Sequence, residues 1–160
     1  MMLLVPTVDE AVRVQRFAGG DADAFSEFYR RYLPAVTGFH LRRTGRRDLA
    51  FDLAAETFAE VIVSALGAVD VGQGAVVANG LCLAVEALPG TDAMLRGVAD
   101  MPLSLRPKGG VFYKAAKPGQ DLRIDLPTLG PATVDLAAKA GLSGIAFQAG
   151  GVICLDLPQM

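Results

Sequence analysis

The chain has 160 residues, of which 52% are hydrophobic and 20% charged, and its formal net charge is −2 at pH 7. This hydrophobic content excludes an intrinsically disordered chain, because disordered segments lack the apolar surface that offsets the entropy of ordering. The small net charge gives no overall attraction to nucleic acid or to an acidic membrane.

The cysteines and the first residues bear on the environment of the protein. Cys82 and Cys154 lie far apart without a neighbouring His or Cys, so we expect buried small hydrophobes and no thiolate metal site. The apolar residues 1–5 are too short for a signal peptide, and no apolar run approaches the roughly 20 residues that span a bilayer. We therefore expect a cytoplasmic protein without a transmembrane segment.

The composition changes near Leu66. All four lysines and 14 of the 18 glycines follow this residue, whereas eight of the 11 aromatic residues and eight of the 11 arginines precede it. We expect two domains, at residues 1–66 and 67–160. The predicted fold class is α+β, with a three-helix unit followed by a small mixed α/β domain that contains a Gly-rich β-hairpin.

The first part has the pattern of a helical unit. Apolar residues recur at three- and four-residue spacing over 8–39 and again over 49–65, which is the period of an amphipathic helix. The pairs Gly-Gly at 19–20 and Thr-Gly at 44–45 predict the two helix breaks. Pro34 should kink the long middle helix, because proline removes one donor and clashes with the preceding turn.

Three motifs in this part occur together, at residues 20–32, 42–45 and 52–58. With them, residues 8–66 resemble region two of an extracytoplasmic-function sigma factor. The DNA-reading parts of that family have no counterpart in this sequence, so we do not expect DNA binding.

The sigma-factor resemblance implies one partner, the clamp of RNA polymerase, contacted through residues 48–62. Asp52 and Glu56 would be the contact residues. Like charges four residues apart mildly destabilise a helix, which suits a surface that meets a basic partner. The alternative is an ordinary solvated helix face.

The last part begins with a predicted hairpin. Asn79-Gly80 lies between two β-prone runs, and this pair readily adopts the two positive φ angles of a type I′ turn. The further expected elements, in chain order, are a helix after the turn at 89–92 with Thr91 or Asp92 as its cap, a strand at 111–113, a helix from Pro131 closed by Gly141, and strands at 145–147 and 152–155.

A polar segment runs from Lys114 to Gly130. Its 17 residues hold three cations, two carboxylates, an amide and a hydroxyl in an otherwise apolar chain. Gathering such groups costs desolvation and backbone freedom, so their density predicts a functional site.

This segment occurs together with Gly72-Gln73, Glu86 and Gly90-Thr91-Asp92. With these motifs, residues 69–156 resemble the DUF1009-type C-terminal domain of UDP-2,3-diacylglucosamine pyrophosphohydrolase of the lipid A pathway. The resemblance implies Mg²⁺-dependent hydrolysis of the pyrophosphate bond of a UDP-sugar lipid. Phosphoryl transfer requires carboxylates for a hard cation and basic side chains for the remaining oxygens, and both are present.

The resemblance also implies residue roles. Asp125 is the first candidate for metal ligand or water activator, and Glu86 could orient one of the ligating residues. The implied sets are catalytic Asp125, Asp121 and Lys117; substrate-binding Lys114, Gln120, Arg123, Thr128, Gln73 and Thr91; and metal-binding Asp125, Asp92 and Glu86. Alternatives remain: Thr128 or Asp125 could cap the next helix, Lys114 and Arg123 could be surface cations, and Gln73 could be a turn residue.

The family has an N-terminal Rossmann-like domain, and sigma-like helices stand in its place here. We therefore expect the fold of residues 67–160 to persist and turnover to be weak or lost. Three hypotheses follow: a hydrolase fragment, a polymerase-binding module, and a chimera of two gene pieces without a selected function.

Overall fold

A four-stranded mixed sheet lies at the centre of the computed structural model, which describes residues 22–121 and 126–160. Its strand order is β2-β1-β3-β5. The strands are β1 (Gly74–Ala78), β2 (Leu81–Val85), β3 (Val111–Lys114) and β5 (Gly144–Phe147). β1 pairs antiparallel with both β2 and β3, whereas β3 and β5 are parallel.

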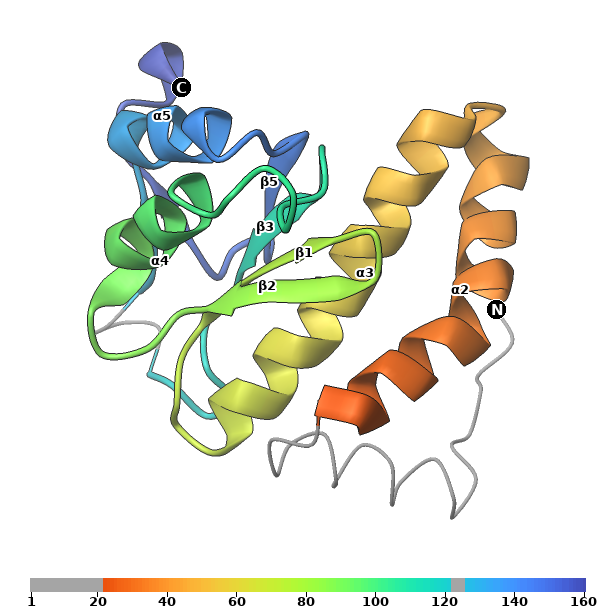
Figure 1. The fold of residues 1–160 in the computed structure, drawn as a ribbon. Coiled ribbons are helices and arrows are strands. Elements are labelled where there is room, and N and C mark those ends of the chain that lie inside the picture. Colours follow the sequence, from red (N-terminus) through yellow and green to blue (C-terminus); the bar gives the residue numbers. More distant parts are fainter. Residues whose placement is uncertain (1–21, 122–125) are drawn as a thin grey trace.

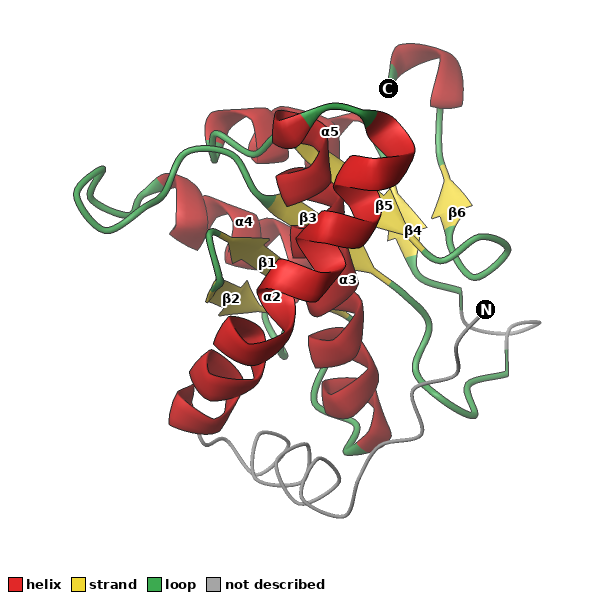
Figure 2. Cartoon of the chain, turned by 90° about the vertical axis from the view of Figure 1, so that its right-hand side faces the viewer, coloured by secondary structure: helices red, strands yellow, loops and turns green. Residues whose placement is uncertain are grey.

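Helices cover both faces of this sheet (Figure 1, Figure 2). On one face lie α2 (Ala22–Thr44) and α3 (Arg47–Ala68). On the other face lie α4 (Gly90–Ala99) and α5 (Pro131–Lys139). The remaining elements are the short parallel pair β4 (Thr128–Leu129) and β6 (Ile153–Cys154), and the 3-10 turn η1 (Leu157–Gln159).

The alternation of side chains along the strands builds two cores. Val77 and Tyr113 pack with α2 and α3, whereas Val76 and Phe112 pack with α4 and α5. Since both faces are covered, all five residues of β1 are buried. This explains why β1 is a continuous small-apolar run rather than an alternating one.

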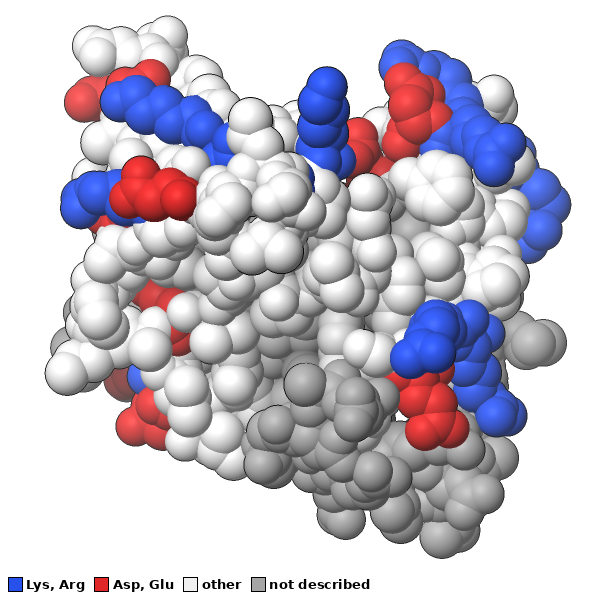
Figure 3. All heavy atoms as spheres, viewed as in Figure 1, with Lys and Arg blue, Asp and Glu red and all other residues white. Residues whose placement is uncertain are grey.

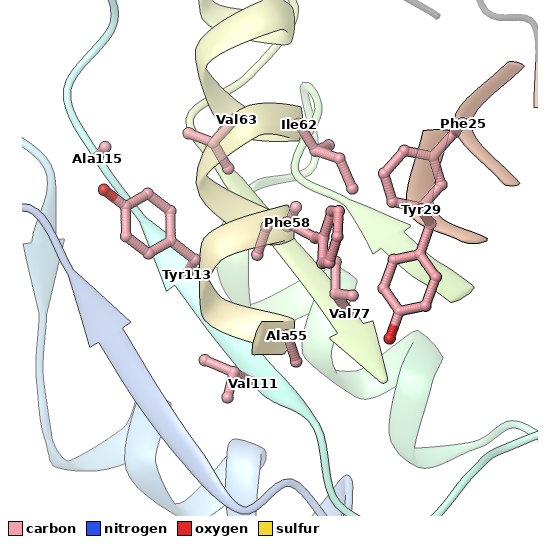
Figure 4. Close-up of a cluster of buried hydrophobic side chains, with 12 residues drawn as sticks. Phe25, Tyr29, Ala55, Phe58, Ile62, Val63, Val77, Val111, Tyr113 and Ala115 are labelled. Atoms are coloured by element: carbon pink, nitrogen blue, oxygen red, sulfur yellow. The ribbon is translucent and has the colours of Figure 1, made fainter. Parts of the chain in front are cut away.

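The core on the α3 side is aromatic (Figure 4). Phe58 of α3 is 1% exposed, and its ring lies 4.3 Å from that of Tyr29 of α2, centroid to centroid. Tyr29 also fits closely against the hairpin turn, where a Cβ on Gly80 would collide with its ring. The helices are thereby packed onto the sheet.

The predicted α+β fold class is confirmed, and so are several local features. Asn79 and Gly80 have φ angles of 46° and 82°, as the predicted hairpin turn requires. α2 ends at Thr44, contains Pro34 and changes direction along its length (Figure 1). The predicted first helix lies outside the described residues.

Two predictions were wrong. α4 begins at Gly90 with no side-chain cap, because the Thr91 hydroxyl accepts a hydrogen bond from Lys114 instead. The two cysteines are half-buried rather than buried, since both lie on strands with partly exposed faces. Burial is still enough to raise the pKa of the Cys82 thiol to about 11.

The two predicted domains share one hydrophobic core. Phe58 and Ile62 precede the predicted boundary and pack in the same cluster as Val77 and Tyr113, which follow it. The boundary at residues 66–67 falls in the last turn of α3. The division into two domains stays a prediction.

Candidate active site

Lys114, the last residue of β3, is almost completely buried, with 4% of its surface exposed. Its Nζ donates a hydrogen bond to Thr91 Oγ1 at 2.5 Å and lies 3.5 Å from Glu86 Oε2. A buried ammonium is costly unless it is paired. These two partners offset that cost and fix the position of the lysine.

Glu86, which directly follows β2, is held in a space made by glycines. A Cβ on Gly74 would lie 2.6 Å from Glu86 Oε2, and one on Gly72 would collide with the Glu86 backbone oxygen. The Gly-Gln-Gly motif at 72–74 therefore admits a buried carboxylate beside the strand. Gln73 lies between them, and its backbone oxygen accepts a hydrogen bond from the Ala115 amide.

Lys114 opens into a cavity of about 420 Å³, here called the Lys114 cavity. Its walls come from the start of α4, the strand β4, the start of α5 and Leu155. Of the predicted site residues, Thr91, Asp92 and Thr128 also line it. The Asp92 carboxylate binds Arg96 at 3.3 Å and remains half exposed.

A second cavity, of about 330 Å³, lies on the opposite face of the sheet and is here called the Tyr113 cavity. It is bounded by α3, by the loop after β3 and by Gln148, which follows β5. The predicted site residues Lys117 and Gln120 line this cavity instead of the first. Lys117 Nζ binds Asp70 Oδ1 at 2.5 Å, and the Lys117 amide donates to Gln120 Oε1 at 2.9 Å.

A family model for the LpxI C-terminal domain matches residues 43–160. The chain belongs to this family. It is 50% identical over 113 residues to the UDP-2,3-diacylglucosamine pyrophosphatase LpxI of Caulobacter vibrioides. The aligned region covers 68% of this chain and 37% of that protein. The chain thus spans little more than a third of the length of this relative.

These comparisons confirm the resemblance predicted for residues 69–156. They do not support the sigma-factor resemblance of residues 8–66 or a contact with RNA polymerase. The LpxI match begins at residue 43 and so includes all of α3. Asp52 and Glu56, the predicted polymerase contacts, are half-buried on α3 and line a shallow hollow beside β5.

The remaining predicted site residues lie in different places. Gln73 is half-buried, and its side-chain Oε1 is enclosed without a hydrogen bond. Asp121 is exposed after Gln120. Arg123 and Asp125 lie outside the described residues.

Sequence reasoning missed Tyr113. It is 5% exposed and lines the Tyr113 cavity. Burial raises the pKa of its hydroxyl, and the carboxylates of Glu60 and Glu56 raise it further. The strand period could have revealed it, because neighbours on a strand point to opposite faces and Tyr113 directly precedes Lys114.

The described residues contain no group of three or more His, Cys, Asp or Glu side chains that could hold a metal ion. Asp92 contributes a carboxylate to the Lys114 cavity, and Thr91 and Thr128 contribute hydroxyl oxygens. Such oxygen donors suit a hard cation when substrate phosphates complete its coordination.

Two broader features concern partners. On the face shown in Figure 3, cations and carboxylates are interspersed around the rim and the middle is uncharged. Within the described part of the chain, no helix combines the length and apolarity that crossing a membrane requires. The cytoplasmic location stays a prediction.

Proposed function

We propose that this chain carries part of the catalytic apparatus for hydrolysing the pyrophosphate bond of UDP-2,3-diacylglucosamine in lipid A biosynthesis. The LpxI family and the name of the Caulobacter relative support this proposal. The observation that carries it is the buried ammonium of Lys114, fixed by Thr91 and Glu86 at the wall of a cavity.

The Lys114 cavity has the electrostatics of an anion site. The first residues of α4 and α5 line it together with the lysine. Helix N-termini present unpaired amide groups and the positive end of the helix dipole, which favour phosphate oxygens. A fixed cation among such groups stabilises the charge that develops as a phosphoryl group is transferred.

Glu86 positions Lys114 and does not itself line the Lys114 cavity. Its carboxylate lies beside the lysine Nζ, and its residue is 8% exposed. Its contribution is to hold Lys114 in place, and the ammonium remains available to a phosphate oxygen. Thr91 adds a second anchor from the first turn of α4.

We also propose that the reaction uses Mg²⁺, which would neutralise charge on the phosphate oxygens. Asp92 would supply a carboxylate ligand from the described part of the cavity. Asp125 and Asp121 remain the proposed candidates for activating water. Asp125 falls on the part of the chain that the structure does not describe.

We further propose that turnover by this chain is weak. The match covers 37% of the Caulobacter protein, and we propose that the remainder of that protein contributes to its substrate cleft. Binding energy from remote parts of a substrate contributes to rate as well as affinity. A reduced cleft therefore lowers the rate.

The test is release of UMP from UDP-2,3-diacylglucosamine by the purified chain, with Mg²⁺ and with EDTA. We compare wild type with the double variant Lys114→Met/Glu86→Gln, which removes both charges together and leaves neither buried alone. Loss of a preorganised electrostatic contact should lower the rate about 10²- to 10³-fold.

The matched control is Lys139→Met, since Lys139 is an exposed lysine at the end of α5 that lines neither cavity. It should release UMP within a few-fold of wild type. A folded double variant as active as wild type, or a folded wild-type chain that releases no UMP, would contradict the proposal.

A further inference from the structure

The Tyr113 hydroxyl is an unused hydrogen-bond donor. Its residue is 5% exposed, yet the hydroxyl makes no hydrogen bond in the described structure and still reaches the cavity surface. In Figure 4 it points along β3 toward Ala115, away from the Phe58 ring. Because the hydroxyl is open to the cavity and bonds to no described group, it is available as a donor or acceptor to a molecule bound there.

The cavity around this hydroxyl has fixed walls. A Cβ on Gly67 of α3 would lie 2.8 Å from Pro118 Cδ, so the glycine lets the loop pack directly on the helix. The Lys117–Asp70 ion pair links the same loop to the segment that follows α3. Across the cavity, the Gln148 amide donates to the Lys114 carbonyl at 3.0 Å and fixes where its side chain begins.

The lining suits an uncharged polar ring. The Gln148 side chain offers a donor and an acceptor, and no described residue bonds to it. Glu60 has no ion-pair partner within the described ranges, whereas Lys117 is already paired with Asp70. An unpaired carboxylate disfavours a phosphate and accepts a hydrogen bond from an N–H group.

The two cavities flank the same strand end. Tyr113 and Lys114 are successive residues of β3, so their side chains leave on opposite faces. Ligands of parallel sheet regions bind at the carboxyl ends of the strands, and β3 and β5 are parallel here. One extended ligand can therefore pass from one cavity to the other over the end of β3.

The two ends of a UDP-sugar lipid, an acyl chain and a uracil ring, differ in polarity. This difference determines which end fits which cavity. Leu155, which lines the Lys114 cavity, is 51% exposed and offers apolar surface for an acyl chain. The Tyr113 cavity instead presents a hydroxyl, an amide and a carboxylate. Uracil carries two carbonyl acceptors with an N–H donor between them, which these groups complement.

We propose that the Tyr113 cavity binds the uracil ring of the nucleotide, with Tyr113 and Gln148 as its recognition residues, while the phosphates cross the end of β3 toward Lys114. This inference rests on the proposed function for the identity of the substrate. Tyr113 and Gln148 are specificity residues, and the phosphates are held on the other face.

The experiment titrates uridine, UMP and CMP onto the folded chain and follows amide chemical shifts by NMR. Tyr113→Phe and Gln148→Ala should each weaken uridine and UMP binding about 3- to 10-fold, the loss of one neutral hydrogen bond. CMP should bind less well than UMP to wild type, because its ring lacks the N–H donor at that position.

Tyr29→Phe is the matched control. It removes the hydroxyl of an equally buried tyrosine of the same core, 6% exposed, which does not line the cavity. It should bind uridine as wild type does. Melting temperatures of all variants show whether the fold is kept.

Three results would overturn the inference: no uridine binding to wild type, equal binding by Tyr113→Phe and Gln148→Ala, or glucosamine responding to these variants while uridine does not. The proposed function fails separately. If the chain releases UMP but the variants bind uridine as wild type does, the uracil site is wrong and the proposed hydrolysis stands. If uridine binding depends on Tyr113 but no UMP is released, the proposed hydrolysis is wrong and the uracil site stands.

Discussion

The two faces of the sheet at the end of β3 solve different physical problems. On one face Lys114 is a buried charge, compensated by Glu86 and Thr91 and opening into a cavity at two helix N-termini. On the other face Tyr113 belongs to an apolar core formed with α3 and also lines a cavity. Both faces carry a hydrophobic core, but at the end of β3 the first face adds a compensated buried charge and the second does not.

The comparison shows how one short strand can serve two parts of a binding site. Successive side chains of a strand diverge by geometry, so a single residue step changes the environment completely. The polar segment after Lys114 therefore does not form one cluster. Lys117 and Gln120 lie beside Tyr113, whereas Thr128 lies beside Lys114.

The largest effect should come from breaking the charge compensation. Lys114→Met leaves the Glu86 carboxylate buried without its cation, which should lower the free energy of unfolding by about 3–5 kcal/mol. Adding Glu86→Gln should restore most of that loss, because no buried charge remains. Urea denaturation of the single and double variants measures both steps, and equal stability of the two would show that the charges are not coupled.

A second prediction compares the hydrophobic cores of the two faces. Ile62 of α3 and Leu95 of α4 are each almost fully buried, at 1% and 0% exposed. Replacing either by Ala should cost about 2–5 kcal/mol of unfolding free energy in a single cooperative transition. An Ile62→Ala variant that unfolds α3 while the sheet keeps its hydrogen-exchange protection would instead support a domain boundary at residues 66–67.

The smallest effect concerns the exposed ion pair at the Tyr113 cavity. The hydrogen bond and charge of Lys117 lower the pKa of the Asp70 carboxyl. Because its folded pKa lies below the unfolded value, the pair stabilises the protein above about pH 4 and ceases to do so as the pH falls through the folded pKa. Asp70→Asn should reduce this acid sensitivity, measured as melting temperature against pH, and an unchanged profile would contradict it.

The site could be predicted from the sequence only in part. Lys114, Thr91 and Thr128 were expected as site residues, and they line one cavity. The contact of Glu86 with Lys114 was not predicted, since the two residues lie 28 positions apart, one directly after β2 and the other at the end of β3, and β1 lies between these strands. Tyr113 was missed because an aromatic residue in a buried strand is normally part of the core.

The sequence by itself determined the local features and the family. Asn79-Gly80 determined the hairpin turn, and Gly45 and Gly141 end helices with φ angles of 67° and 70°. These features depend on the backbone preferences of one or two residues. The motifs around Lys114 likewise carried the LpxI resemblance, because a motif is read along the chain.

Only the tertiary structure decided that α3 covers the sheet and that the polar segment divides over its two faces. The helical pattern of α3 showed that it has an apolar face, and the pattern is equally compatible with a separate helical unit. Its packing on β1 and β3 depends on contacts between residues distant in the sequence. Local propensities do not encode such contacts, since they arise from which apolar surfaces can be buried together at once.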